Sequence, residues 1–121
     1  MDEQTFKDRT RRFALAVIGL VEALPRTRTA DVLGRQLLRC GTSVGANYRA
    51  ACRGRSAADV ISKLSIVEEE ADESIFWLDL LIDARVVSAN HAAALKKEAN
   101  ELVTMTVASI KTLRRRTRGS S

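Results

Sequence analysis

The sequence predicts an all-α protein, an antiparallel up-down-up-down four-helix bundle made by a single domain over residues 1–121. Apolar side chains recur three and four residues apart along nearly the whole chain, and no segment alternates with the period of a strand. Three short breaks interrupt this rhythm, so helices adjacent in sequence must run antiparallel. Hydrophobic residues make up 45% of the chain and charged residues 29%, which is typical of a globular protein.

The first predicted helix covers residues 4–24 and turns Phe6, Phe13 and Val17 to one face. It ends at Pro25, the only proline of the chain, because proline cannot continue a helix. The polar segment RTRT that follows forms the first break.

The second predicted helix covers residues 30–53, with Leu37 and Val44 on its core face. Thr29 is the expected N-cap, since a threonine oxygen can accept a hydrogen bond from the first turn. Gly54 is expected to end the helix in a left-handed conformation.

The third predicted helix covers residues 57–84, and Ser56 is its expected N-cap. The fourth covers residues 89–115 and begins after Ser88, which can cap it in the same way. The C-terminal residues 116–121 are expected to be frayed.

Charge is distributed in blocks along the chain. The net charge is +5, but residues 1–55 hold 11 basic and 5 acidic side chains, residues 56–88 hold 2 and 8, and residues 89–121 hold 7 and 2. Opposed surfaces of this kind suit either self-association or binding of a polyanion.

A helical wheel of the second helix separates three faces. One face, opposite the core face, carries four arginines that point within about 40° either side of one direction: Arg35, Arg39, Arg49 and Arg53. They form either a solvated face or a binding surface.

A ridge of small residues flanks that core face. It consists of Gly34, Gly41 and Gly45, which cost the helix roughly 2 to 3 kcal/mol relative to alanine. We therefore expect another helix to pack closely along this ridge. Asn47 lies at the other margin, where a structural hydrogen bond to a facing helix is expected.

The third helix is apolar on two sides in its second half. Homo-oligomerisation is the economical explanation, and burial under a terminal segment is the alternative. The candidate interface residues are Ile66, Glu69, Glu73, Phe76, Trp77 and Leu80. The acidic members of this set could meet the arginine stripe of a neighbouring subunit.

No combination of side chains predicts catalysis. His91 is the only histidine, and neither Cys40 nor Cys52 has a histidine beside it to act as a base. We expect no enzymatic activity, metal or cofactor. No apolar run reaches the length of a membrane span, and the two cysteines are too far apart on one helix for a disulfide, so a soluble cytoplasmic protein is expected.

Arginines predict a candidate nucleic-acid surface, because guanidinium groups bind phosphates. Contacts would be to the RNA or DNA backbone with little readout of sequence. Another protein is the alternative partner, with the arginines in salt bridges between subunits. The candidate residues are Arg9, Arg11, Arg12, Arg35, Arg39, Arg49, Arg53, Arg55, Arg114, Arg115 and Arg116.

The segments QLLRCGTSVGANYRAACRGRS and KLSIVEEEADESIFWLDLLID carry a resemblance to a known family. The chain resembles the four-helix bundle proteins encoded in intervening sequences of bacterial 23S rRNA genes. The matching positions are Gln36, Leu37, Ser43, Val44, Ala46, Asn47, Arg55, Ser56, Glu70, Ala71, Glu73, Trp77 and Leu78. The family's usual acidic residue a turn after Asn47 is absent, since alanines stand there. The family is similar in fold to the accessory protein of diversity-generating retroelements, which implies a ring-like pentamer and favours nucleic-acid binding.

Overall fold

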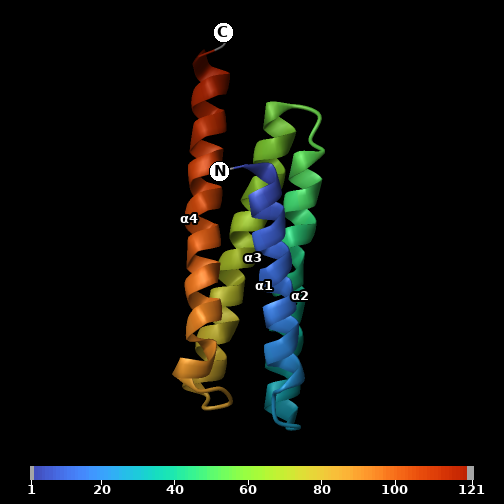
Figure 1. Ribbon diagram of the computed structural model, residues 1–121, viewed down its shortest axis with the longest axis vertical. Coiled ribbons are helices and arrows are strands. Elements are labelled where there is room, and N and C mark those ends of the chain that lie inside the picture. The colour runs from blue at the N-terminus through green and yellow to red at the C-terminus, as the bar shows by residue number, and fades with distance from the viewer. Residues whose placement is uncertain (1, 120–121) are drawn as a thin grey trace.

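The computed structural model describes residues 2–119, and this part of the chain contains four α-helices and no strand. Successive helices run in opposite directions, which gives the up-down-up-down bundle that the periodicity predicts (Figure 1). The helices are α1 (Glu3–Glu22), α2 (Arg28–Cys52), α3 (Ala57–Asp83) and α4 (Ala89–Gly119).

Side chains cap all four helices at their first turns, and Asp2 caps α1 by accepting from the Thr5 backbone N–H at 3.0 Å. The Ser56 hydroxyl accepts from the Asp59 backbone N–H at 3.1 Å, and the Ser88 hydroxyl accepts from the His91 N–H at 3.1 Å, so both predicted caps are present. The prediction for α2 was wrong by two residues. Thr27, in extended conformation, accepts from Ala30 at 3.1 Å, so Thr29 lies inside the helix.

The turn after α2 does not use a left-handed glycine. No glycine in residues 2–119 has a positive φ, so the conformation expected for Gly54 was wrong. Its small size matters instead, because a Cβ there would collide with the side chain of Val60 at the start of α3. Among residues 2–119 the left-handed conformation is found at Arg85 (φ 59°), which follows α3.

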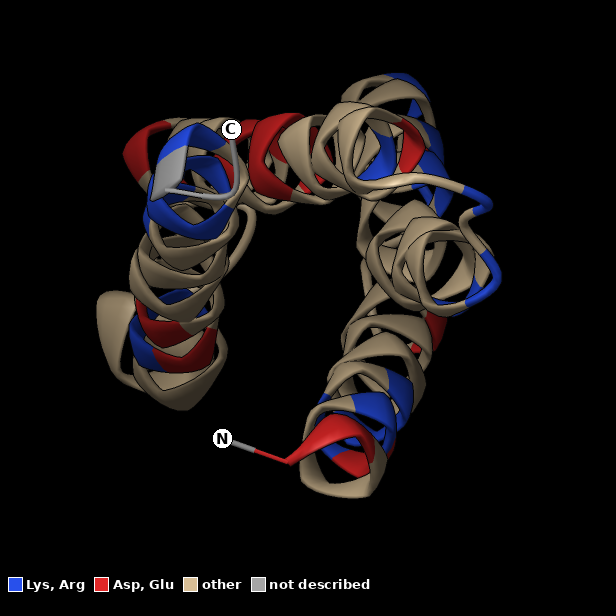
Figure 2. Ribbon diagram, turned by 90° about the horizontal axis from the view of Figure 1, so that it is seen from above, with Lys and Arg blue, Asp and Glu red and all other residues tan. Residues whose placement is uncertain are grey.

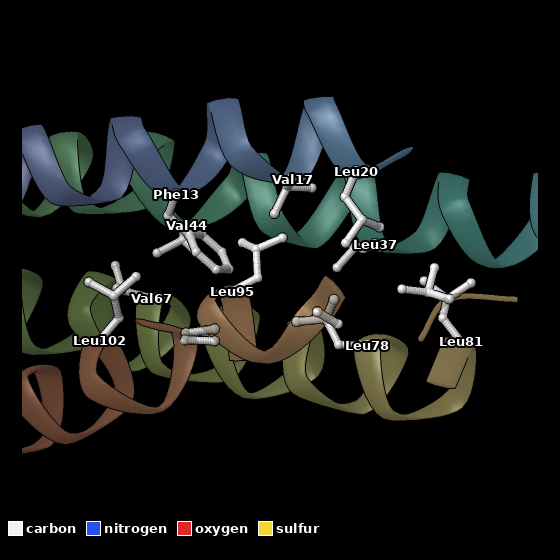
Figure 3. Close-up of a cluster of buried hydrophobic side chains, with 14 of the residues drawn as sticks. Phe13, Val17, Leu20, Leu37, Val44, Val67, Leu78, Leu81, Leu95 and Leu102 are labelled. Atoms are coloured by element: carbon white, nitrogen blue, oxygen red, sulfur yellow. The ribbon is translucent and has the colours of Figure 1, made fainter. Parts of the chain in front are cut away.

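The core is built from apolar residues of all four helices (Figure 3). Phe13 of α1, Leu37 of α2, Leu78 of α3 and Leu95 of α4 belong to the main buried cluster. A second, smaller cluster of Ala51, Leu64 and Ile110 lies further along the bundle and joins α2, α3 and α4.

The long α4 extends beyond the expected boundary. Residues 116–119 are helical rather than frayed, while residues 120–121 lie outside the described part of the chain. Lys and Arg side chains near the end of a helix favour this extension, because they offset the negative end of the helix dipole.

The four helices do not contact one another equally. α2 packs on α3, α3 on α4 and α1 on α2, while α1 and α4 share the smallest contact and lie apart at the open side of the bundle (Figure 2). None of the helices described here is both long and apolar enough to cross a membrane.

Candidate nucleic-acid interface

Arginines cluster where α2 ends and turns into α3. Arg49 lies in the last turn of α2, Arg53 is the C-cap residue and Arg55 follows in the turn, and all three side chains are exposed. Their position at a helix C-terminus is electrostatically favourable, because cations offset the negative end of the helix dipole. Figure 2 shows basic residues along this connection.

A second basic group lies on the last turns of α4. Lys111, Arg114, Arg115 and Arg118 line one shallow depression, because residues three, four and seven positions apart share a helix face. Arg116 points to a different side and lines a groove together with Tyr48 and Cys52 of α2. Lys111 was not among the predicted site residues, although its helical spacing to Arg114 and Arg115 is readable in the sequence.

The small second core cluster brings these two groups to the same end of the molecule. Ala51 lies between Arg49 and Arg53 of the α2 group, and Ile110 directly precedes Lys111 of the α4 group. Because these two residues pack in one cluster with Leu64 of α3, α2 and α4 bring the two groups to the same end of the bundle, on either side of α3 (Figure 1). We call this surface the basic end; its members are Arg49, Arg53, Arg55, Lys111, Arg114, Arg115, Arg116 and Arg118.

The basic end has one carboxylate beside it, since Asp59 accepts a hydrogen bond from the Arg55 backbone N–H at 3.2 Å, but its cationic side chains are not ion-paired. Among residues 2–119, none of its eight members forms an ion pair with a carboxylate. Arg115 donates a long hydrogen bond of 3.5 Å to the Thr112 hydroxyl, and Arg118 donates one of 3.5 Å to the Arg114 carbonyl oxygen. These cations therefore keep their charge available for an external anion.

Two of the four arginines in the predicted α2 stripe form ion pairs within the chain. Arg35 pairs with Asp31 one turn earlier at 3.0 Å. Arg39 lies 2.7 Å from Glu73 and 3.4 Å from Glu70, both on α3. Two of the four stripe arginines therefore have carboxylate partners within the chain, and those of Arg39 lie on the neighbouring helix, which a single-helix wheel does not include.

Arg9 also forms ion pairs within the chain, unlike the nearby Arg11 and Arg12. Its guanidinium contacts Glu98 and Glu101 of α4, and its side chain is only 22% exposed. These carboxylates raise the pKa of Arg9, chiefly through the hydrogen bond to Glu98. Arg11 and Arg12 are exposed on α1 and form no ion pair within the described residues.

The candidate interface residues of α3 have unequal surroundings. Phe76 is 55% exposed, and its ring stands edge-on to Trp77 with centroids 5.0 Å apart. Trp77 packs against the main core, where its indole N–H is enclosed without a hydrogen-bond partner. Ile66 and Leu80 are half-buried and Glu69 is exposed.

Two acidic residues of that face differ in their availability. Glu73 pairs with Arg39 of the same chain, so the expected pairing with a neighbouring subunit's arginine is not needed to satisfy it. Glu69 forms no ion pair within residues 2–119.

The glycine ridge of α2 faces α1. A Cβ at Gly34 would lie 2.9 Å from Leu24, one at Gly41 would lie 2.9 Å from Val17, and one at Gly45 would lie 3.2 Å from the Thr10 hydroxyl oxygen. The close helix approach expected from the spacing is present, and α1 is the helix that makes it.

Asn47 does not bridge two helices. Its amide donates to the Ser43 carbonyl oxygen of the same helix at 2.9 Å, so the expected hydrogen bond to a facing helix was wrong. A side-chain amide inside a helix can bond the carbonyl one turn back, and this local bond takes the place of a contact between helices.

No cluster suited to a metal ion is present in the part of the chain that the structure describes. No three histidine, cysteine, aspartate or glutamate side chains come together there to hold a metal ion. His91 is exposed in the first turn of α4. Burial raises the pKa of the Cys40 thiol, which donates a 3.6 Å hydrogen bond to the Leu37 carbonyl oxygen.

Known proteins match this chain in both sequence and structure. The family described as 23S rRNA-intervening sequence protein matches residues 3–108. A crystal structure of a protein of unknown function from the S23 ribosomal protein family of Bacteroides thetaiotaomicron superposes with a TM-score of 0.85 at 33% identity, covering 92% of this chain and 99% of that one. Comparison with curated proteins gives no match.

Proposed function

The chain belongs to the family of 23S rRNA-intervening sequence proteins, and we propose that it is a non-enzymatic, homo-oligomeric bundle that binds the backbone of RNA or DNA through its basic end. The observation that supports this most is the absence of any carboxylate partner for eight cationic side chains gathered at one end of residues 2–119. Each arginine bound to a phosphate would release a counterion, so affinity should fall steeply with salt.

The proposed contacts are to phosphates rather than to bases. Arginines on helix ends can follow a strand of phosphates, but they do not present a planar stack of aromatic rings. The one tyrosine of the chain, Tyr48, has its ring against Phe6 with centroids 4.3 Å apart, which leaves it poorly placed as a stacking platform. Binding with little sequence preference is therefore expected.

Self-association is the second part of the proposal. The exposed ring of Phe76, beside half-buried Leu80, supports a contact between subunits on the outer face of α3. The resemblance to the accessory protein of diversity-generating retroelements supports a ring-like pentamer. The two unpaired thiols, Cys40 and Cys52, support a location in the reducing cytoplasm.

A protein assembly or adaptor module is the alternative function. It is favoured by Glu69 and Asp72 on the same side of α3, which have no cationic partner in residues 2–119 and could pair with arginines of another subunit. In that case the arginines would serve protein contacts rather than phosphate contacts.

Binding of a labelled single-stranded RNA at several salt concentrations tests the two functions. We expect the double variant Arg49→Ala, Arg53→Ala to weaken binding and to make the logarithmic salt slope shallower by about 2, one unit for each lost phosphate contact. Arg35→Ala is the matched control, because Arg35 is on the same helix but pairs with Asp31. Unchanged RNA binding in the double variant, or loss of the oligomer, would instead support the adaptor function.

A further inference from the structure

The outer face of α2 carries cations from its first turn to its last. In α2 and its C-cap the charged side chains are five arginines and a single carboxylate, Asp31. On a helical wheel Arg28 falls on the same side as Arg49 and Arg53, opposite the core residue Leu37. Arg28 therefore extends the arginine stripe of α2 to the end of the bundle that lies opposite the basic end (Figure 1).

A second group of free cations lies at that opposite end. Arg26, in the connection between α1 and α2, and Arg28 are both exposed and form no ion pair within residues 2–119. The next arginine, Arg35, pairs with Asp31, and the exposed Glu22 of α1 pairs with none of these arginines. The outer face of α2 thus has uncompensated cations at its two ends and compensated ones between them.

Helix stability does not account for the position of Arg28. It lies in the first turn of α2, at the positive end of the helix dipole, where a cation is unfavourable. The capping contact there is made by the Thr27 hydroxyl with the Ala30 N–H, without the Arg28 side chain. Arg26 and Arg28 line one hollow beside α1, which places the two cations close together. Binding of an external anion explains this pair better than folding does.

The two cation groups of α2 are separated by about one turn of a DNA duplex. Arg28 precedes Arg49 by 21 residues and Arg53 by 25. At 1.5 Å rise per residue these separations are roughly 32 and 38 Å. One turn of B-form DNA is about 34 to 36 Å long, or about 10 base pairs. The phosphates of one strand therefore return to the same side of a duplex at the spacing of the two groups.

The stretch between the two groups suits a stiff ligand better than a flexible one. Arg39 is held by Glu73 of α3, and the side chains that follow on this face, Thr42 and Ala46, are short and uncharged. A duplex is stiff over this length, so it spans the stretch without a free cation to hold it there. A single strand would lose conformational freedom on bridging the same distance.

We infer that the outer face of α2 binds a B-form DNA duplex along its length, with phosphates one turn apart at Arg28 and at Arg49 and Arg53. This inference rests on the proposed phosphate binding at the basic end and names the duplex as its substrate. The contacts are to the DNA backbone, so binding depends on the length of the duplex rather than on its sequence.

Two labelled DNA hairpins test the inference, one with 7 and one with 14 base pairs and both with the same loop. At 3.4 Å per base pair their stems are roughly 24 and 48 Å long, so only the longer stem reaches both cation groups. Contact at a second site on one molecule is intramolecular and raises the affinity. A single-stranded DNA with as many nucleotides as the longer hairpin is the third probe. Anisotropy with the full chain at several salt concentrations measures binding.

We expect the 14-base-pair hairpin to bind at least about tenfold more tightly than the shorter hairpin or the single strand. Arg28→Ala should weaken binding of the longer hairpin several-fold and make its logarithmic salt slope shallower by about 1. Binding of the shorter hairpin, held at the basic end, should stay unchanged. Lys97→Ala is the matched control, because Lys97 is exposed on α4 and forms no ion pair within residues 2–119. Thermal melts verify that both variants remain folded.

Three results would overturn the inference. The first is an equal affinity for the two hairpins, and the second is an Arg28→Ala variant that binds the longer hairpin like Lys97→Ala. The third is a single strand that binds as tightly as the longer hairpin, which would make single-stranded DNA the substrate. With RNA binding that still depends on Arg49 and Arg53, these results count against this inference alone. Absence of binding by every DNA and RNA probe would count against the proposed function itself.

Discussion

The guanidinium of Arg39 on α2 lies 2.7 Å from the carboxylate of Glu73 on α3. This pair, with the longer contact to Glu70, joins the two helices on the outer side of the bundle. It also divides the arginines of α2 into two groups, because Arg35 and Arg39 are compensated within the chain while Arg49 and Arg53 are not. The cations available to an external anion are therefore those at the basic end.

The Arg39 contacts should affect stability more than binding. We expect Arg39→Ala to lower the free energy of unfolding only slightly, since ion pairs between half-exposed groups contribute little. Its RNA affinity should stay close to that of the unmodified protein. Urea unfolding and RNA titration measure the two effects, and an affinity loss equal to that of Arg49→Ala would show that Arg39 also contacts phosphate.

The Arg9 cluster should hold α1 against α4. The guanidinium of Arg9 meets Glu98 and Glu101, and these two helices share the smallest contact in the bundle. We expect Arg9→Met to cost about 1 to 2 kcal/mol and to lower hydrogen-exchange protection of α1 before that of α3. Arg12→Met is the control, because Arg12 is exposed on the same helix. Uniform loss of protection across all helices would contradict this role.

Two glycines should respond to alanine in opposite directions. A Cβ at Gly19 would meet nothing within 4 Å, so Gly19→Ala should stabilise the protein by roughly 0.5 to 1 kcal/mol through helix propensity. A Cβ at Gly41 would lie 2.9 Å from the branched side chain of Val17, so Gly41→Ala should destabilise it by about 1 to 3 kcal/mol. Thermal unfolding compares the two, and a stabilised Gly41→Ala would mean that α1 moves away at little cost.

Ionisation of Tyr48 should destabilise the protein at high pH. Burial, and then the neighbouring Cys52, raise the pKa of this phenol well above its ordinary value of 10.0. The folded protein therefore retains the proton longer than the unfolded chain does. Stability is unaffected below pH 10 and falls as the pH rises above it.

Absorbance at 295 nm measures this titration without interference, because Tyr48 is the only tyrosine. Tyr48→Phe should remove this part of the alkaline destabilisation and change stability little at pH 7. A midpoint near pH 10 in the folded protein would contradict a buried phenol.

The proposed contact between subunits centres on Phe76. We expect Phe76→Asp to shift the protein to smaller species in sedimentation velocity, since a carboxylate would be desolvated in an apolar contact. Leu15→Asp is the control, because Leu15 is similarly exposed, at 57%, on a different helix. An unchanged oligomer after Phe76→Asp and after Leu80→Asp would rule out this face as the interface.

Local sequence was sufficient for the helices themselves. The three-and-four spacing of apolar residues predicts the positions of four helices, and Ser56 and Ser88 mark where two of them begin. Both signals can be read from the sequence because they depend only on residues close together along the chain. The glycine spacing also predicted a close helix neighbour, since only a backbone without Cβ atoms permits that approach. The family resemblance rests on the same local motifs, and the family match covers residues 3–108.

Tertiary structure decided which charged groups remain free and where apolar surface stays uncovered. Arg9 and Arg39 face acidic residues 89 to 92 and 31 to 34 positions away, and no single-helix wheel includes those partners. The groove lined by Tyr48, Cys52 and Arg116 likewise depends on the level at which α1 begins beside α4, which follows from the packing register of four helices. Sequence periodicity determines the direction in which a side chain points from its own helix, whereas its partners depend on how the helices are aligned with one another.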